Sequence, residues 1–487
     1  MKSRKNIVLL MADQHQAEMM GCAGDSFAQT PNIDKLAARG TRFERAYCQG
    51  PLCMPARASL LTERFVRDHG VFENSSEIPP GLPTFTQRLR EAGYHTCEIG
   101  KMHLWAHGLV NVTRASEMSG YLDGLGFSEP IETVGKLASA RYDTPYTDYL
   151  ADKNLLEAYR DFVRPRLHSG DRGTHAWDAT PGPTGTEDYV DVWHGERAAK
   201  WIRDYRSEKP FLLWLGFPGP HDPYDAPVSA RARFANNAPP MPRSKSLPEL
   251  PAEGPLRFFL QWLFRYCDSE TMTDEVIARM RLAYYANISL IDDAVGRIVA
   301  ALEETGQLDD TWIVYTSDHG EMMGEHRMIA KMAFFEQAVR VPLIVCPPGG
   351  SKPKVQTAPV QMMDLAATFR DIAAAGAIAG SAANSLRPTV EGDAQPFRQD
   401  VIVSENFGFA MFLKGPHKLV VYEDDIKPVQ FFDLARDPAE DRNLINDPAY
   451  ASIIAEIMQT HVRPFFAVKP LRPHADIVKR QAKKVEY

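Results

Sequence analysis

Asn6-Ile-Val-Leu-Leu-Met-Ala-Asp-Gln14 is an apolar run that ends in two polar side chains. A compact apolar run of this kind is typical of a strand that is buried on both faces, as strands are in a parallel sheet. Open α/β sheets bind their ligands beyond the carboxyl ends of such strands. We therefore expect Asp13 and Gln14 to lie at a binding site.

Helical and strand patterns alternate along the chain after this first strand. Apolar residues recur at helical spacing in several segments, and Gly40 and Gly93 follow two of these segments as stop signals. The expected helices are residues 31–38, 83–92 and 275–304, and the further strands are residues 95–99, 211–217 and 311–316. This alternation predicts an α/β fold with a large, mostly parallel sheet flanked by helices.

The composition changes after the Ala- and Gly-rich residues 373–383. Short strand patterns follow at residues 400–404, 409–413, 417–422 and 429–433, and they predict a small C-terminal α+β subdomain with an antiparallel sheet. We therefore divide the chain into a large N-terminal domain, residues 1–395, and a C-terminal subdomain with a tail, residues 396–487.

Other segments are expected to surround the core. Residues 109–189 and 225–254 are rich in Pro, Gly and charge, so we expect long excursions that frame a pocket. Residues 256–266, LRFFLQWLFRY, predict a helix with aromatic side chains on nearly every side, which is either buried or covers a pocket or subunit interface. With the tail, residues 469–487, this helix leads us to expect a homo-oligomer.

The overall charge excludes some classes of partner. The chain has 487 residues, a formal net charge of -8, 44% hydrophobic residues and 24% charged residues. An acidic globular chain without a basic tract is a poor partner for nucleic acid or an anionic membrane, so an anionic ligand must be held by local charges.

Location and disulfide content follow from the apolar runs and the cysteines. The apolar runs are shorter than the ~18–20 residues that span a bilayer, and the basic residues before Asn6 do not lead into a signal-peptide cleavage site. The six cysteines form no C-x-x-C pair. We therefore expect a cytoplasmic protein without membrane spans, disulfides or structural zinc.

Cys53-Met-Pro-Ala-Arg57 is the most specific motif of the chain. Pro55 suits the first turn of a helix, so Cys53 is expected at a helix N-terminus, where free N–H groups and the helix dipole favour an anion. A lone cysteine is more often a small buried thiol. C-x-P-x-R followed by an apolar turn, however, resembles the signature of the type I sulfatases, although Glu63 stands where that family commonly has Gly. The resemblance implies that Cys53 is oxidised to formylglycine by a formylglycine-generating or sulfatase-maturating enzyme.

Asp318 and His319 end a late strand, as Asp13 and Gln14 end the first. Oxygen and imidazole ligands from two neighbouring strand ends can share one cation. Together with TSDHGEMMGEH from Thr316 to His326, they resemble the metal site of the alkaline phosphatase superfamily. The resemblance implies an alkaline phosphatase-like fold and one divalent cation, manganese or calcium, bound by these four side chains and residue 53. Gln14 and His319 replace two ligands of many sulfatases, a variant that resembles the phosphonate monoester hydrolase branch.

Lys101 and His103, in the sequence GKMH, follow an expected strand and match a further sulfatase pattern. In that pattern the lysine binds the sulfuryl group and the histidine serves as a base. Phosphonate hydrolases of the same branch tend to lack this pair, so its presence favours sulfate esters. His221 and Lys331 resemble the family's contacts to the leaving group, and Asn74 resembles a polar contact of the phosphonate hydrolase branch.

The resemblance implies hydrolysis of sulfate monoesters in the manner of an arylsulfatase. Hydrated formylglycine would attack sulfur, and a covalent sulfo-enzyme would be released by elimination with His103 as base. Arg57 would hold the diol, Lys101 and Lys331 the sulfuryl oxygens, and His221 with Lys331 the departing oxygen.

The natural substrate is left open at this stage. Aryl, choline and sugar sulfates are all candidates, and activity toward phosphonate monoesters and phosphodiesters is expected beside sulfatase activity. One alternative is a phosphonate monoester or phosphodiester hydrolase that uses the same site. A second is a catalytically silent protein that binds sulfated ligands.

Overall fold

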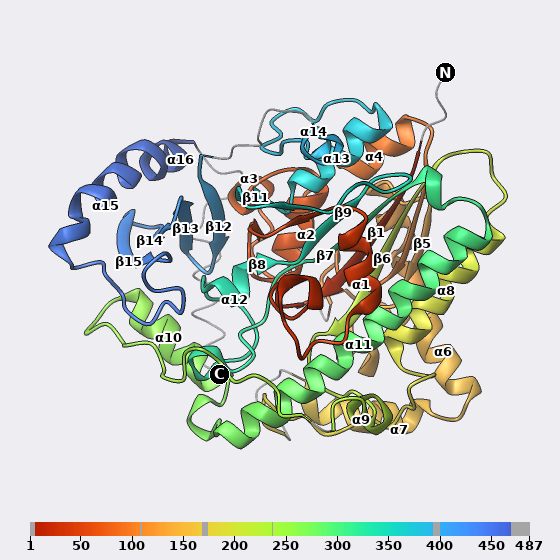
Figure 1. Cartoon of the computed structure of the whole chain (residues 1–487), viewed down its shortest axis with the longest axis horizontal. Coiled ribbons are helices and arrows are strands. Elements are labelled where there is room, and N and C mark those ends of the chain that lie inside the picture. Colours follow the sequence, from red (N-terminus) through yellow and green to blue (C-terminus); the bar gives the residue numbers. More distant parts are fainter. Residues whose placement is uncertain (1–4, 108–109, 168–173, 236, 393–399, 469–487) are drawn as a thin grey trace.

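The computed structural model describes residues 5–107, 110–167, 174–235, 237–392 and 400–468 (Figure 1). An eight-stranded sheet lies at its centre. In spatial order the strands are β10 (Lys354–Gln356), β2 (Thr41–Phe43), β9 (Leu343–Cys346), β7 (Thr311–Ser317), β1 (Asn6–Asp13), β6 (Phe211–Pro220), β4 (His95–Gly100) and β5 (Glu129–Glu132). Neighbouring strands are parallel except at β9, which is antiparallel to both β2 and β7. The expected mostly parallel sheet is confirmed.

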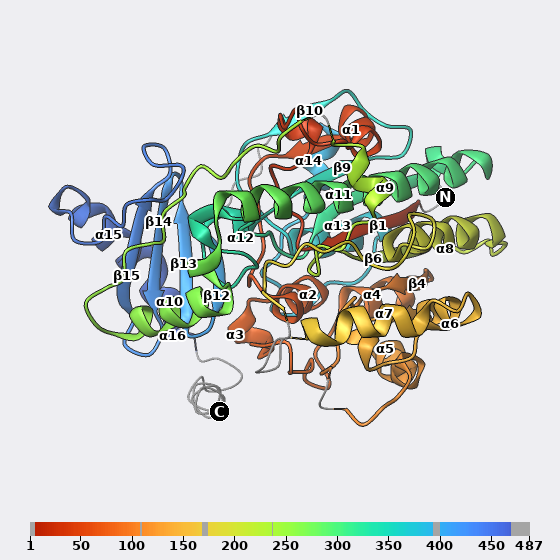
Figure 2. The ribbon, with the colours of Figure 1, turned by 90° about the horizontal axis from the view of Figure 1, so that it is seen from below.

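Helices cover both faces of this sheet. The α-helices of the described chain are α1 (Pro31–Ala38), α2 (Cys53–Thr62), α3 (Val66–His69), α4 (Phe85–Glu91), α5 (Ser119–Gly124), α6 (Pro145–Asp152), α7 (Leu156–Val163), α8 (Val190–Asp204), α9 (Val228–Ala232), α10 (Pro255–Tyr266), α11 (Asp274–Glu304), α12 (Glu336–Val339), α13 (Asp364–Ala373), α14 (Arg387–Glu391), α15 (Ala451–Ile457) and α16 (Arg463–Ala467). The last two pack on the C-terminal sheet instead. Alternate side chains of β1 point to opposite faces. One set packs with α1, α8 and α11, and the other packs with α2, α4 and α13. Figures 1 and 2 show α8 and α11 running side by side.

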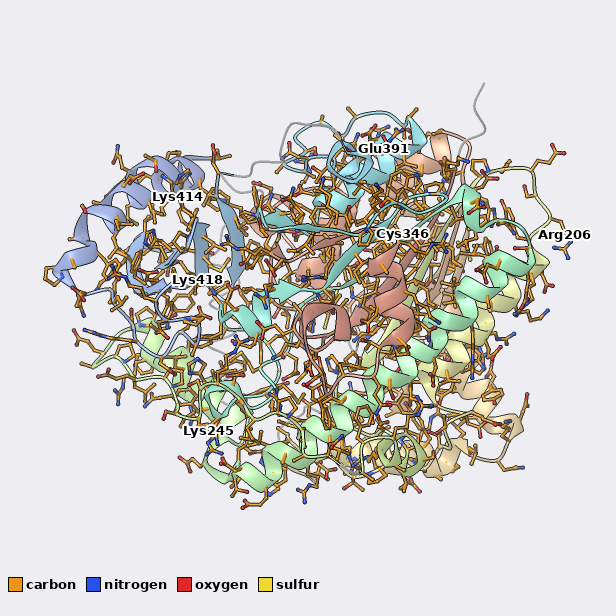
Figure 3. All side chains as sticks on the ribbon, in the orientation of Figure 1. Arg206, Lys245, Cys346, Glu391, Lys414 and Lys418 are labelled. Carbon is orange, nitrogen blue, oxygen red and sulfur yellow. The ribbon has the colours of Figure 1, made fainter. Side chains whose placement is uncertain are left out.

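Two smaller sheets complete the described chain. One has the order β11 (Val360–Gln361), β3 (Ala46–Tyr47) and β8 (Arg340–Val341), and the other has the order β12 (Ile402–Asn406), β13 (Phe409–Lys414), β14 (His417–Tyr422) and β15 (Lys427–Asp433). The second sheet is antiparallel throughout, as expected for the C-terminal region. Lys418 of β14, labelled in Figure 3, is fully buried, with its Nζ 2.8 Å from Glu336 Oε1 and 2.7 Å from Glu440 Oε1. The pair with Glu336 joins the antiparallel sheet to α12.

Residues 109–189 differ from the expectation of a simple excursion. Their described part contains α5, α6 and α7, and it also contributes β5 to the edge of the main sheet. The sequence of β5 is EPIE, which has no apolar run and includes a proline. Proline is tolerated in edge strands because one side of the strand needs no hydrogen-bond partner. The pattern of a buried strand is therefore missing from this segment.

α10 is buried along one stripe. Leu256, Leu260 and Leu263 are buried, whereas Phe258 on the same helix is 70% exposed. The helix is therefore amphipathic, and a partner for its exposed side stays a prediction. The expected boundary between residues 395 and 396 and the tail, residues 469–487, lie outside the described residues. Within the described ranges no helix combines the length and the apolar character needed to cross a bilayer.

Gly100 links the sheet to the loop that carries Lys101. It ends β4 with a φ of 107°, and a Cβ there would lie 2.1 Å from the carbonyl oxygen of Gly216 on β6. We predict that Gly100→Ala lowers the free energy of unfolding by about 2 kcal/mol or more, because the new methyl group adds both backbone strain and a clash. Urea unfolding measures the change. Gly120→Ala on α5 is the matched control, since a Cβ there meets nothing within 4 Å, and equal stability of the two variants would contradict the prediction.

Candidate active site

Cys53 is the first residue of α2, as the nearby proline predicts. Leu52 before it has extended backbone, and all residues of α2 are buried. The side-chain oxygen of Asn74 accepts a hydrogen bond from the Met54 N–H at 3.0 Å. Asn74 therefore contacts the backbone of the helix that carries Cys53, and it satisfies one of the N–H groups that a helix start leaves free.

The ends of β1 and β7 bring the acidic residues of the site together. The two strands pair in parallel, so Asp13 and Asp318 emerge at the same edge of the sheet. The Sγ of Cys53 lies 3.3 Å from His319 Nε2 and 3.9 Å from Asp13 Oδ1. One donor atom from each of these four buried residues lies within 4.8 Å of the others. Two carboxylates and an imidazole are ligands that fit a divalent cation such as manganese or calcium.

Arg57 lies between the two carboxylates. Its Nε is 2.9 Å from Asp318 Oδ2, its Nη2 is 3.1 Å from Asp13 Oδ2, and the side chain is fully buried. Its Nη1 donates to the backbone oxygens of Lys101 at 2.6 Å and of Met102 at 3.3 Å. The Nζ of Lys101 is 2.5 Å from the same Asp13 oxygen that Arg57 contacts. Arg57 therefore connects α2, both strand ends and the loop after β4.

These positive charges shift the acid–base behaviour of the site. Burial raises the pKa of Asp13, and so does Cys53, but Lys101, His221 and Arg57 outweigh them and hold this pKa well below its usual range. Burial likewise raises the pKa of the Cys53 thiol, but Lys331, Lys101 and His319 lower it well below the usual range. The site therefore stabilises an anionic group at position 53.

Lys331 and His221 lie on another side of the site. The Nζ of Lys331 is 2.5 Å from Gln14 Oε1 and 2.8 Å from His221 Nε2. The Nδ1 of His221 lies 3.0 Å from Asp222 Oδ1. Burial, Lys331 and Lys101 lower the pKa of His221, but the Asp222 and Asp13 carboxylates outweigh them and raise it to about 9. His221 therefore holds its Nδ1 proton toward Asp222.

The structure brings together the residues that the sequence motifs single out. His103 hydrogen-bonds to Cys53, and its pKa is lowered by burial, an effect that the hydrogen bond opposes. Gln14 lies at the site but is oriented by contacts that the motifs do not reveal.

Some residues of the site carry no sequence signal of their own. Asp222 follows His221 and contacts it, and Glu321 accepts a hydrogen bond from the side-chain amide of Gln14. Glu132 accepts hydrogen bonds from the Met102 N–H at 3.2 Å and holds the loop after β4 from the side of β5. For Glu321 the sequence gives only an indirect sign of a place at the site, because it lies three residues after Asp318 in the D-H-G-E sequence.

Family comparison agrees with this geometry. The family model described as Sulfatase matches residues 5–375, which is more than half of the chain. The chain belongs to the sulfatase family. A second family model, described as N-sulphoglucosamine sulphohydrolase, C-terminal, matches residues 324–463 of this sulfatase-family protein.

Individual relatives cover nearly the whole sulfatase-family chain. The choline-sulfatase of Rhizobium meliloti (strain 1021) is 29% identical over 472 residues, which cover 91% of this chain and 83% of the relative. The arylsulfatase of Clostridium perfringens (strain 13 / Type A) is 29% identical over 471 residues, which cover 92% and 91%. The solved phosphonate monoester hydrolase of Agrobacterium radiobacter has a TM-score of 0.79 at 22% identity, with 94% of this chain and 95% of that chain covered. The expected alkaline phosphatase-like fold is confirmed.

Removal of the Arg57 charge tests the electrostatics of this sulfatase-family site. We predict that Arg57→Met lowers the free energy of unfolding by about 3–5 kcal/mol in EDTA, because Asp13 and Asp318 lose their buried partner. Added manganese or calcium should recover part of the loss by neutralising the same carboxylates. Denaturant unfolding with and without metal measures both effects.

The control for this measurement is Arg88→Met, which breaks a solvent-exposed pair with Glu91 on α4. Exposed pairs contribute about 1 kcal/mol or less, so this variant should unfold nearly as the parent protein does. If Arg57→Met were as stable as Arg88→Met in EDTA, the buried guanidinium would not have the role described.

Proposed function

We propose that this protein hydrolyses sulfate monoesters, with formylglycine formed from Cys53 and one divalent cation, manganese or calcium, bound by Asp13, Gln14, Asp318 and His319. Membership of the sulfatase family supports hydrolysis of sulfate or phosphonate esters. Hydrated formylglycine supplies a nucleophilic hydroxyl, and the cation supplies Lewis acidity. Side chains of the protein bind the substrate, accept and donate protons and stabilise the leaving group.

Binding of an anionic ester is supported by the local charge. Lys101, Lys331 and Arg57 are buried around Asp13 and Asp318, so three permanent positive charges meet two carboxylates before any cation is bound. The low pKa of Cys53 reflects the same field. Lysine and arginine groups held in a water-poor site can neutralise the charge of sulfuryl oxygens without rearrangement during the reaction.

The observation that carries the proposal is the position of Lys101 and His103 beside residue 53. Lys101 contacts Asp13, and His103 hydrogen-bonds to Cys53. Because burial lowers the pKa of His103, its imidazole is neutral at pH 7 and can accept a proton from the group at position 53. Lysine for the sulfuryl group and a histidine base are the roles that the family resemblance implies for these two residues.

The leaving group is assigned to the opposite pair. His221 and Lys331 contact each other through Nε2 and Nζ at 2.8 Å, and Asp222 lies on the far side of the imidazole. This pair can donate a proton to a departing oxygen and recover it from solvent, while the Asp222 carboxylate holds the imidazole through Nδ1. It is compatible with sulfate, phosphonate and phosphodiester leaving groups alike.

The organic part of the substrate is proposed to bind on the His103 side. The ring of His107 stacks on His103 with centroids 4.4 Å apart, Trp105 lies 4.1 Å from His107, and Tyr142 lies 5.1 Å from Trp105. Trp105 and Tyr142 are buried, so these rings pack on one another and form the wall behind His103. An aryl sulfate and choline sulfate are two candidate substrates for this side of the site. Sugar sulfates stay a third candidate.

A phosphonate monoesterase or phosphodiesterase is the second candidate function. Gln14 and His319 at the cation site favour it, and so does the fold shared with a phosphonate monoester hydrolase of Agrobacterium radiobacter. Lys101 and His103 oppose it. We propose that both ester classes are cleaved and that sulfate esters are preferred.

Further expectations follow from the same proposal. A formylglycine-generating or sulfatase-maturating enzyme would modify Cys53, and the catalytic and C-terminal regions would function as one protein. Homo-oligomerisation and a cytoplasmic location stay predictions.

Substitution of Lys101 and His103 tests the preference for sulfate. We predict that Lys101→Ala and His103→Ala each lower kcat/KM for an aryl sulfate by about 10²–10⁴-fold, as expected for loss of an oxyanion contact or a base. The loss for a phenyl phosphonate should be smaller. Steady-state kinetics on the metal-loaded protein measure both, with Lys153→Ala, an exposed lysine paired with Asp188, as the control. A parent enzyme that strongly prefers phosphonates would overturn our first choice.

Mass spectrometry of the peptide that contains residue 53 tests the nucleophile. We predict an aldehyde at this position in protein from the native host, together with loss of ester hydrolysis in Cys53→Ala. An unmodified thiol in active protein would exclude the formylglycine mechanism. An unmodified thiol in inactive protein that still binds sulfated ligands would instead support a silent binding protein.

A further inference from the structure

Every polar group of Gln14 has a partner. Its N–H donates to Asp318 Oδ1 at 3.1 Å, and its backbone oxygen accepts from the Tyr284 hydroxyl at 2.5 Å. Its side-chain Oε1 accepts from Lys331 Nζ at 2.5 Å, and its Nε2 donates to Glu321 Oε2. The residue is fully buried and has a φ of 71°, a conformation that few residues other than glycine adopt.

The two side-chain contacts determine which way the amide points. An amide oxygen and an amide NH₂ have nearly the same shape, so packing alone does not distinguish the two orientations. An ammonium group such as that of Lys331 only donates, and a carboxylate such as that of Glu321 only accepts. In the reversed orientation the NH₂ of Gln14 would face the ammonium and its oxygen would face the carboxylate. Both contacts would then be lost in a buried place, where unmade hydrogen bonds are costly.

Glu321 cannot turn away from this contact. Its Oε1 accepts from the Met323 N–H at 3.0 Å, and its Oε2 lies 3.3 Å from the hydroxyl of Tyr224. The side chain is fully buried. Glu321 also follows Asp318 by three residues in the loop after β7, so its position is tied to that of a proposed cation ligand.

We propose that Glu321 is a positioning residue that keeps the amide oxygen of Gln14 directed toward Lys331 and toward the cation site. This assignment rests on the proposed function, because it concerns the cation that Gln14 would bind. Gln14 is then a neutral oxygen ligand of the cation. A carboxylate ligand would place a negative charge directly at the cation, whereas here that charge is on Glu321, which contacts the far side of the Gln14 amide. Residues that orient metal ligands in this way contribute strongly to metal affinity.

The assignment predicts a loss of metal affinity that activity alone would not reveal. Manganese binding to the purified full-length protein, measured by calorimetry and by the electron paramagnetic resonance of free Mn²⁺, should weaken about 10–100-fold in Glu321→Ala. Glu321→Gln should weaken it less, because the new amide can still accept one hydrogen bond but no longer enforces one orientation of Gln14. This milder variant keeps the test valid if Glu321→Ala does not fold.

A matched control is available in the same loop. Glu325 is also a buried carboxylate, but it accepts from the backbone N–H groups of Arg243 and Ser244 at 3.0 Å and has no contact with Gln14 among those recorded for the described chain. Glu325→Gln should leave manganese affinity unchanged. Equal losses in Glu325→Gln and Glu321→Gln would show a general effect on the loop and would overturn the assignment.

A double variant separates orientation from simple structural support. In Gln14→Glu the two side-chain oxygens are equivalent, so orientation no longer matters, but the new carboxylate faces Glu321 and binding should weaken. In Gln14→Glu with Glu321→Gln, the amide at 321 can donate to the carboxylate at 14, and affinity should return to within about 10-fold of the parent. A double variant that binds no better than either single variant would overturn the assignment.

Metal binding by the parent protein distinguishes a failure of the proposed cation site from a failure of the role of Glu321. If it binds neither manganese nor calcium, the proposed cation site fails, and the role of Glu321 fails with it. If the parent protein binds manganese and both Glu321 variants bind it equally well, the cation site stands and the role of Glu321 is wrong.

Discussion

The buried guanidinium of Arg57 holds two carboxylates, Asp13 and Asp318, at one edge of the central sheet. Parallel pairing of β1 with β7 forces those carboxylates together, and two like charges in a buried place repel unless a cation lies between them. The same guanidinium contacts the backbone of Lys101 and Met102. One side chain, a turn away from Cys53, thus determines the relative positions of α2, the acidic strand ends and the loop that carries Lys101 and His103.

The site is positively charged although the protein as a whole is acidic. The chain as a whole carries a net charge of -8, whereas the site gathers Arg57, Lys101 and Lys331 around residue 53. A localised positive field in an acidic protein attracts small anions without attracting nucleic acid. Gln14 and Glu321 extend this arrangement, because the neutral amide of Gln14 faces Lys331 while the negative charge of Glu321 lies behind it. In our proposal this keeps one negative charge away from the position of the sulfuryl group. This arrangement is the basis of our proposal that a divalent cation and an anionic ester bind in adjacent places.

Local patterns were sufficient for the elements with strong periodicity. The helix expected at 31–38 has those bounds in α1, and the strands expected at 211–217 and 311–316 became β6 and β7 with longer carboxyl ends. The antiparallel orientation of β9 relative to its neighbours could not be predicted, because an apolar run of four residues does not indicate the orientation of a strand. β5 was missed because an edge strand with a proline and two glutamates has no apolar alternation to detect.

The sequence by itself determined which chemical groups are present and the motifs that carry them: C-x-P-x-R with its helix start, the polar residues at two strand ends, and G-K-x-H. These features depend on neighbours close in the chain, so residue types and spacing are enough to identify them. Only the tertiary structure decided that Glu321 accepts a hydrogen bond from Gln14, that Asp222 contacts His221 and that Glu132 accepts from the Met102 N–H in the loop after β4. Two of these contacts bring together segments far apart in the chain, and all three depend on strand pairing and loop packing. Such hydrogen-bond partners are set by the whole fold rather than by local periodicity.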